Sequence, residues 1–112
     1  MDIPIFHKTY ELYKLLYQNL KSFPKKDKYT LGQKIDNTAL EILETITLAG
    51  ISNQNKLNLL EKASQKLDLL KILIRLADDL KILDNKKYLE IQQKIQEIGK
   101  MLGGWIKSRA RE

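Results

Sequence analysis

Lysine and arginine are the residues with which this sequence could do chemistry, because they are concentrated in two short segments. Residues 21–34 contain five lysines and one aspartate, a net charge of +4, and residues 99–112 contain four basic residues and one glutamate, a net charge of +3. The whole chain carries +6, so the remainder sums to −1. A localised basic surface is typical of proteins that bind nucleic acid, an anionic membrane face or an acidic protein. A solvated loop and a frayed tail are the alternative interpretation. The candidate binding residues in these segments are Lys25, Lys26, Lys28, Lys34, Lys100, Lys107, Arg109 and Arg111.

Other chemistry has few residues to support it. The chain has no cysteine, which excludes disulfides, thiolate nucleophiles and cysteine zinc sites. Its single histidine, His7, excludes paired-histidine metal motifs. Asp78 and Asp79 are adjacent, so on a helix their side chains point about 100° apart and do not readily share a substrate oxygen. We find no nucleophile–base pair and expect no catalytic residue, no metal and no cofactor: the protein is not predicted to be an enzyme.

Size and hydropathy bound the architecture and the location. A chain of 112 residues and 13.1 kDa is predicted to form one domain, residues 1–112. No apolar run approaches the ~18 residues of a membrane span. The N-terminus has an acid at position 2 and no long apolar stretch, so it does not have the pattern of a signal peptide. We therefore expect a cytoplasmic protein without membrane partners.

The elements that must position the basic residues are predicted to be helices. Apolar residues recur at steps of three and four, Pro occurs twice and Gly five times. Pro24 ends the first helix, Thr30 is a plausible N-cap for the second and Gly50 a stop, and Asp84 or Asn85 caps the last. The predicted helices span about residues 4–22, 30–49, 55–83 and 85–107. Short connections between long helices predict an all-α, up-down-up-down antiparallel four-helix bundle.

Each predicted helix has an apolar face, and the third has two. The face predicted for the first helix consists of Phe6, Tyr10, Tyr13, Leu16 and Leu20. That of the second is Leu31, Ile35, Ala39, Ile42, Ile46 and Ala49, and that of the fourth is Tyr88, Ile91, Ile95, Ile98, Leu102 and Trp105. On the third helix one seam is Leu60, Ala63, Leu67, Leu70, Ile74 and Ala77, and the other is Leu69, Leu73, Leu76, Leu80 and Leu83, with Ile72 beside it. A helix that is apolar nearly all round is usually buried on several sides. The second seam therefore predicts an interface with another copy of the protein, and a well-covered central helix is the alternative.

Three features near these seams have two interpretations each. Lys71 and Arg75 lie one turn apart and could contact phosphate or a protein partner, or could pair with Asp68 and Asp79 on a solvated stripe. Gly99 and Gly103 form a G-x-x-x-G pattern that permits close backbone approach, or a fraying helix end. Trp105 lies on the apolar stripe, which favours packing in the core or at a subunit interface over base stacking.

Three ordered segments resemble a known family. They are Phe23-Pro24-Lys25-Lys26 at the end of the first helix, the run Lys71–Ala77 (KILIRLA) on the third, and the run Glu97–Lys107 (EIGKMLGGWIK) on the fourth. In this order they are similar to the accessory variability determinant (Avd) family of diversity-generating retroelements. That family lies within a wider group of four-helix bundles, which includes proteins encoded by ribosomal-RNA intervening sequences. The likeness extends from Phe23 to Ser108, more than three quarters of the chain.

The resemblance implies a non-catalytic partner of a retroelement reverse transcriptase. Members form homopentameric, barrel-like assemblies with a basic surface, bind the reverse transcriptase and nucleic acid, and act when template RNA is copied with errors into cDNA. The family's basic positions correspond here to Lys25, Lys26, Lys71 and Arg75, and its basic or polar positions around the glycine–tryptophan motif correspond to Lys100 and Lys107. At position 71 a lysine replaces the familiar arginine, which keeps the charge but loses bidentate phosphate geometry.

Three other functions remain open at this point. The chain could be a basic bundle of the ribosomal-RNA intervening-sequence type. It could be an oligomeric scaffold that does not bind nucleic acid, with Leu69, Leu73, Leu76, Leu80 and Trp105 at the subunit interface. A membrane-surface binder is the weakest candidate, because no helix combines a lysine-rich face with an exposed aromatic face along its length.

Overall fold

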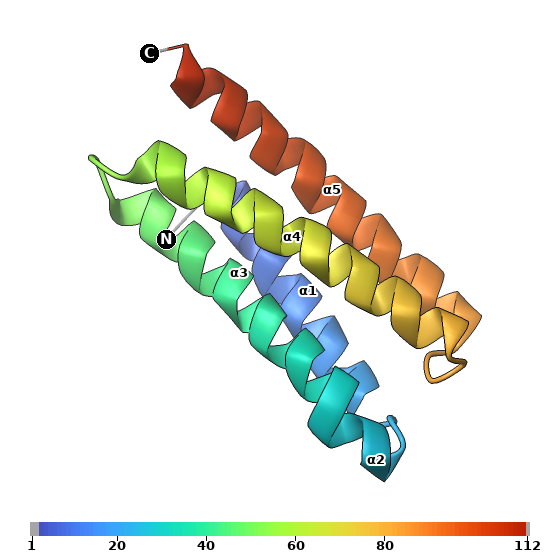
Figure 1. Cartoon of the computed structure of the whole chain (residues 1–112). Coiled ribbons are helices and arrows are strands. Elements are labelled where there is room, and N and C mark those ends of the chain that lie inside the picture. The colour runs from blue at the N-terminus through green and yellow to red at the C-terminus, as the bar shows by residue number, and fades with distance from the viewer. Residues whose placement is uncertain (1–2, 112) are drawn as a thin grey trace.

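The computed structural model describes residues 3–111 as helices joined by short connections, with no strand in that range (Figure 1). The elements are α1 (Pro4–Leu20), α2 (Lys25–Asp27), a π-helical turn (Lys28–Gly32), α3 (Gln33–Ile51), α4 (Lys56–Asp79) and α5 (Asn85–Ala110). The four long helices surround one core, because α3 and α5 each contact both α1 and α4. The prediction of an all-α protein with four long helices is therefore confirmed.

The core is built from the predicted stripes of three helices. Every residue of the first seam of α4, from Leu60 to Ala77, is buried. On α3 the predicted face is buried from Ile35 to Ala49, and on α5 it is buried from Ile91 to Leu102, while Tyr88 and Trp105 pack at its ends. Spacing of three and four residues keeps these side chains on one side of each helix, so that they are buried together in the core.

The buried face of α1 differs in part from the predicted one, because of the five predicted residues only Leu16 is fully buried. Ile5, Thr9, Leu12 and Leu16 enter the core, whereas the stripe that contains Tyr10 and Tyr17 faces outward. Both stripes have helical spacing, so periodicity did not distinguish them. The aliphatic stripe fits a core of Ile and Leu, and its Thr9 hydroxyl is satisfied by donating to the Ile5 carbonyl at 2.8 Å. The tyrosines are left at the surface, where their hydroxyls can reach water.

The non-helical part of the connection between α1 and α3 is shorter than predicted, because most of the connection is itself helical. Helix α1 ends at Leu20 rather than at residue 22, and the next helical run begins at Lys25 rather than at Thr30. Pro24 occupies the N-cap position of that run, in an extended conformation that a proline adopts readily. Thr30 is therefore not an N-cap; its hydroxyl donates to the Lys26 carbonyl at 3.2 Å from within the run. The lysines expected on a loop lie on a continuous helical segment.

The ends of the other helices also differ from the predictions. Helix α3 continues one residue past Gly50, and α4 ends at Asp79 instead of residue 83. Lys81 has a φ of 60°, and the Ile82 N–H bonds to the Ala77 carbonyl while the Lys81 N–H bonds to the Asp78 carbonyl. This is a Schellman ending, which usually has a glycine at the left-handed position. Asp84 then caps α5 by accepting a hydrogen bond from the Lys86 N–H at 2.9 Å, and α5 continues to Ala110 rather than 107.

Candidate partner and nucleic-acid interface

A groove between α4 and α5 brings together two of the predicted basic residues. Lys71 of α4 and Lys100 of α5 both line a cavity of about 390 Å³, with Asp68, Gln96 and Gly99 around it. The floor of the groove is apolar, formed by Leu67 and Ile95. Lys71 and Lys100 are 29 positions apart in sequence, so only the packing of the two helices makes them neighbours.

Gln92, which the sequence analysis did not single out, fixes the two helices beside Lys71. The Gln92 side chain is buried, and its Nε2 donates to the backbone carbonyl of Lys71 at 3.2 Å. Among the described residues its Oε1 has no hydrogen-bond partner. The sequence contains one feature that could have indicated Gln92: it directly follows Ile91 of the apolar stripe, and a polar side chain buried beside a core position needs a hydrogen-bond partner.

Lys71 and Arg75 are both exposed on α4, one turn apart. Neither the Asp68–Lys71 nor the Arg75–Asp79 ion pair forms among residues 3–111. In this conformation the two cations are therefore not neutralised by the carboxylates that were the alternative explanation for them. They remain available to an anionic partner.

The first basic segment covers one end of the bundle. Lys25 and Lys26 in α2, Lys28 in the π-helical turn and Lys34 in α3 are all exposed. Because they belong to a single helical run, the spacing of their attachment points is defined by the backbone. This arrangement is more ordered than the solvated loop considered from the sequence.

The second basic segment ends α5. Lys107 and Arg111 are exposed, and Arg109 is partly buried. Lys107 and Arg109 lie in the last turn of the helix, where positive charge interacts favourably with the carbonyl end of the helix dipole. A frayed tail was the alternative interpretation of this segment, and the predicted helix ended at residue 107, but the structure continues the helix through Ala110.

An exposed apolar strip runs along the outer side of α4. Ile72 and Leu80 are 58% and 57% exposed, Leu76 lies between them, and Leu69 is half-buried. Two residues of the predicted interface, Leu73 and Trp105, are partly buried and pack against the core of the same chain. Leu83, also assigned to the second seam, is a core residue, since the chain turns before it. The alternative of a fully covered central helix does not describe this chain.

Trp105 and the neighbouring glycines lie near the C-terminal end of α5. The Lys56 Nζ lies 5.6 Å from the centroid of the Trp105 ring, and the ring packs on the core. Of the two interpretations of Gly99 and Gly103, close backbone approach is absent within residues 3–111, and the helix does not end there but continues to Ala110. A Cβ at Gly103 would have no neighbour within 4 Å, and one at Gly99 would make ordinary contact with Leu67.

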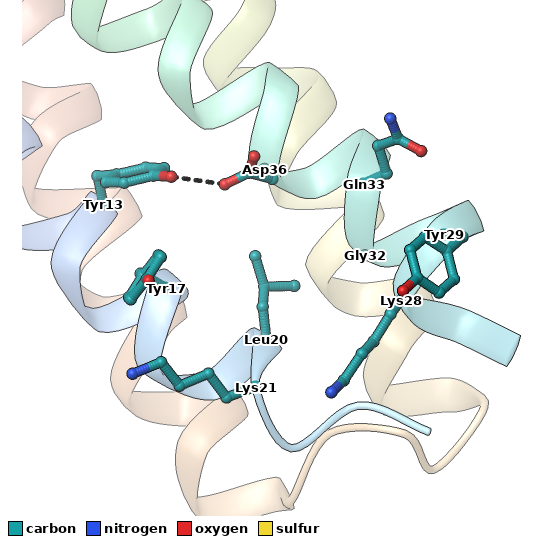
Figure 2. A pocket seen from close by; sticks show the side chains of 9 residues that line it. All are labelled: Tyr13, Tyr17, Leu20, Lys21, Lys28, Tyr29, Gly32, Gln33 and Asp36. Carbon is teal, nitrogen blue, oxygen red and sulfur yellow. Dashed lines mark hydrogen bonds between the residues drawn. The ribbon is translucent and has the colours of Figure 1, made fainter. Parts of the chain in front are cut away.

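A second cavity, of about 440 Å³, lies between α1 and the π-helical turn (Figure 2). Tyr13 lies at one side of it, and its hydroxyl donates to Asp36 Oδ1 at 2.7 Å. Burial, together with the hydrogen bond to Asp36, raises the pKa of Tyr13 to about 12. Gly32 lies at the opposite wall, where a Cβ would be crowded at 3.0 Å from the Asp27 carbonyl oxygen and 3.4 Å from Phe23. No residue pattern in the sequence indicated this cavity.

Two further observations concern membranes and metals. Within residues 3–111 no helix combines the length and the apolar character needed to cross a membrane. In the same range, histidine and acidic side chains do not gather in groups of three that could hold a metal ion.

Comparison with protein families matches the bAvd-like family over residues 4–109, a range that includes all three segments on which the resemblance was based. Comparison with curated proteins finds no match. The matched range covers the four long helices except Ala110, and it includes every candidate basic residue except Arg111. The chain therefore belongs to the bAvd-like family, whose members are accessory, non-catalytic proteins of the retroelement type.

Proposed function

We propose that this protein is the accessory subunit of a diversity-generating retroelement, which binds the reverse transcriptase and the template RNA or cDNA during mutagenic retrohoming. Membership of the bAvd-like family is the observation that carries this proposal. The groove between α4 and α5 supports it, because it presents Lys71 and Lys100 beside an apolar floor. An apolar floor with a basic rim suits a protein partner, since burial of the floor stabilises the complex and the charges orient it.

The proposal includes an oligomer. We infer an up-down-up-down order for the helices, supported by the short connections and by the reversals of the chain at each end of the bundle in Figure 1. The exposed strip on α4 then packs against neighbouring copies in a homopentameric ring, with Leu69, Leu73, Leu76 and Leu80 at the contact. Trp105 lies beside Lys56 at the other end of α4 and would form a separate part of the interface. Apolar side chains this exposed are typical of an interaction surface.

Nucleic acid is assigned to the two basic segments apart from Lys100. Lys25, Lys26, Lys28 and Lys34 at one end, and Lys107, Arg109 and Arg111 on α5, would be repeated in each copy of the ring. Such repetition favours binding that depends weakly on sequence and strongly on salt. Because the protein acts together with a polymerase and its RNA, we also expect it in the cytoplasm.

The test is a pair of double variants in a pull-down with the reverse transcriptase of the same element. Lys71→Ala with Arg75→Ala should reduce capture of the reverse transcriptase about tenfold or more, while the helicity and the oligomer mass stay unchanged. Lys25→Ala with Lys26→Ala removes the same charge from an equally exposed helical surface and serves as the control. The control should keep the capture and lower the affinity for nucleic acid. Undiminished capture by the Lys71/Arg75 variant would show that both residues belong to a solvated face and do not contact the reverse transcriptase.

A further inference from the structure

The cavity between α1 and the π-helical turn combines tyrosine rings with lysines, a combination that the accessory role does not itself explain. Tyr17 comes from α1 and Tyr29 from the π-helical turn, and Figure 2 shows Leu20 between them. Lys21 and Lys28 line the same cavity. We call this set of five residues the tyrosine–lysine hollow. Its volume of about 440 Å³ lies within the range of pockets that hold small ligands.

The rings of the hollow are exposed to an unusual degree. Tyr29 is 72% exposed and Tyr17 is 50% exposed. Among the described residues, Tyr29 makes no ring–ring or cation–ring contact, so its faces are unoccupied. An aromatic ring exposed to water is stabilised when another flat apolar group stacks on its face.

The charges around the rings indicate an anionic ligand. The Lys21 Nζ lies 4.8 Å from the centroid of the Tyr17 ring, and Lys28 lines the cavity beside Tyr29. Asp36 is the carboxylate in the lining, and its Oδ1 already accepts the Tyr13 hydroxyl. Lys25 and Lys26, in the turn before Lys28, add two more exposed cations. A wholly apolar ligand would not use these lysines, and a duplex backbone would not use the rings.

We propose that the tyrosine–lysine hollow is a stacking site for unpaired bases of single-stranded nucleic acid, with Lys21 and Lys28 at the flanking phosphates. Aromatic platforms beside a positively charged track are the common means of binding single strands without sequence preference. The proposal rests on the proposed function and deepens it, because it assigns the nucleic-acid role to a defined surface. A regular duplex buries its base faces and therefore cannot use the rings.

The test compares single-stranded and duplex probes by fluorescence anisotropy. A labelled 20-nucleotide oligouridylate and a labelled 20-base-pair duplex are titrated with the full chain and with the variant Tyr17→Leu/Tyr29→Leu. Leucine keeps the charge and the helix propensity but removes the ring. We expect the affinity for the single strand to fall about tenfold or more, with the duplex affinity within about twofold and the salt dependence unchanged, because a base stacked on an aromatic ring contributes about 1–3 kcal/mol.

The controls separate stacking from charge and from folding. Tyr10→Leu changes a tyrosine of α1 that is about as exposed as Tyr17 but lies outside the hollow, and it should have no effect. Tyr17→Phe/Tyr29→Phe should retain single-strand binding, since the rings remain. Lys21→Gln/Lys28→Gln should weaken binding of both probes and reduce the salt slope. Circular dichroism checks that each variant is as helical as the wild type.

Each remaining outcome decides the proposal. An unchanged single-strand affinity, or an equal loss for both probes, overturns the stacking site while leaving the proposed function in place. Loss of reverse-transcriptase capture with unchanged single-strand binding identifies the hollow as a protein contact and also overturns it. If the wild-type protein binds neither probe, the nucleic-acid part of the proposed function fails together with the site.

Discussion

Tyr13 connects α1 to α3 through one polar contact whose strength depends on pH. Its hydroxyl donates to Asp36 Oδ1 at 2.7 Å, and burial followed by the effects of Asp36 raises the pKa of Tyr13 from 10.0 to about 12. Because the pKa is higher in the folded protein than in the unfolded chain, folding favours the protonated hydroxyl. The resulting stabilisation is complete below about pH 10 and is lost as the pH rises from 10 to 12.

Replacement of Tyr13 by phenylalanine should remove that contribution. At pH 7 we expect Tyr13→Phe to lower the free energy of unfolding by about 1 kcal/mol, the usual net value of a hydrogen bond. Above pH 10 the difference from the wild type should shrink. Urea unfolding at pH 7, 9 and 11 measures it, with Tyr17→Phe as the control on the same helix. A difference that stays constant across this range would contradict the assignment.

Two ion pairs between helices show the opposite dependence on pH. Glu41 of α3 pairs with Lys66 of α4 at 2.8 Å, and Glu97 of α5 pairs with Lys8 of α1. The hydrogen bond and charge of the lysine lower the pKa of each glutamate. Any stability that these pairs add is therefore present above the ordinary glutamate range and is lost as the pH falls through the lowered pKa. Both pairs are on the surface, so they orient neighbouring helices more than they stabilise the fold.

At the scale of the element, the end of α4 is the clearest case of a residue in a conformation that its type disfavours. Lys81 has left-handed backbone geometry at the position where a Schellman ending usually has glycine. The ending places Leu83 in the core and brings Asp84 to the N-cap of α5. It therefore determines where α5 begins relative to the end of α4.

Glycine at this position should stabilise the protein. A left-handed conformation costs a non-glycine residue about 1–2 kcal/mol, and part of that gain is offset by the entropy of glycine in the unfolded chain. We expect Lys81→Gly to raise the free energy of unfolding by about 0.5–1 kcal/mol. Lys62→Gly, at an exposed position within α4, is the matched control and should lower it by about 1 kcal/mol. Thermal and urea unfolding measure both, and destabilisation by Lys81→Gly would show that the left-handed turn is not maintained in solution.

At the scale of the whole molecule, we expect the exposed strip on α4 to determine the oligomeric state of the protein. Light scattering of the wild type at low micromolar concentration should give about five times the chain mass of 13.1 kDa. Leu76→Asp should dissociate the assembly, because it places a charge in the centre of the apolar strip. Leu89→Asp, at an equally apolar and more exposed position of α5 outside the strip, should leave the mass unchanged. A wild-type mass of one chain would remove the basis for the interface.

The distribution of charge makes a separate prediction about the assembled protein. Each copy contributes a net charge of +6, so a ring presents its basic segments several times over. The affinity for duplex DNA should fall steeply with salt, by about 0.9 log unit of the binding constant for each phosphate neutralised and each log unit of salt. Titrations between about 50 and 200 mM salt measure the slope. Binding that is indifferent to salt in this interval would exclude the basic segments as the contact.

Local periodicity determined most of the architecture. The stripes of α3, α4 and α5 were predicted residue by residue, because a 3.6-residue repeat is written into each segment and needs no information about its neighbours. Asp84 as a cap of α5 followed from side-chain chemistry close in sequence. The apolar strip on α4 was also visible beforehand, since a second stripe on a helix is a property of that helix alone. Family membership added the accessory role to this picture.

Tertiary structure decided the features that depend on residues distant in sequence. Two stripes of α1 had the same period, and only the shape of the core formed by the other helices selected Leu12 over Tyr13. Lys71 and Lys100 line the same cavity because α4 and α5 pack side by side, and Gln92 of α5 donates a hydrogen bond to the Lys71 carbonyl of α4. The tyrosine–lysine hollow exists because α1 and the π-helical turn approach each other over Gly32. Periodicity states which residues share a face, but the free energy of packing decides which face is covered and which neighbours it meets.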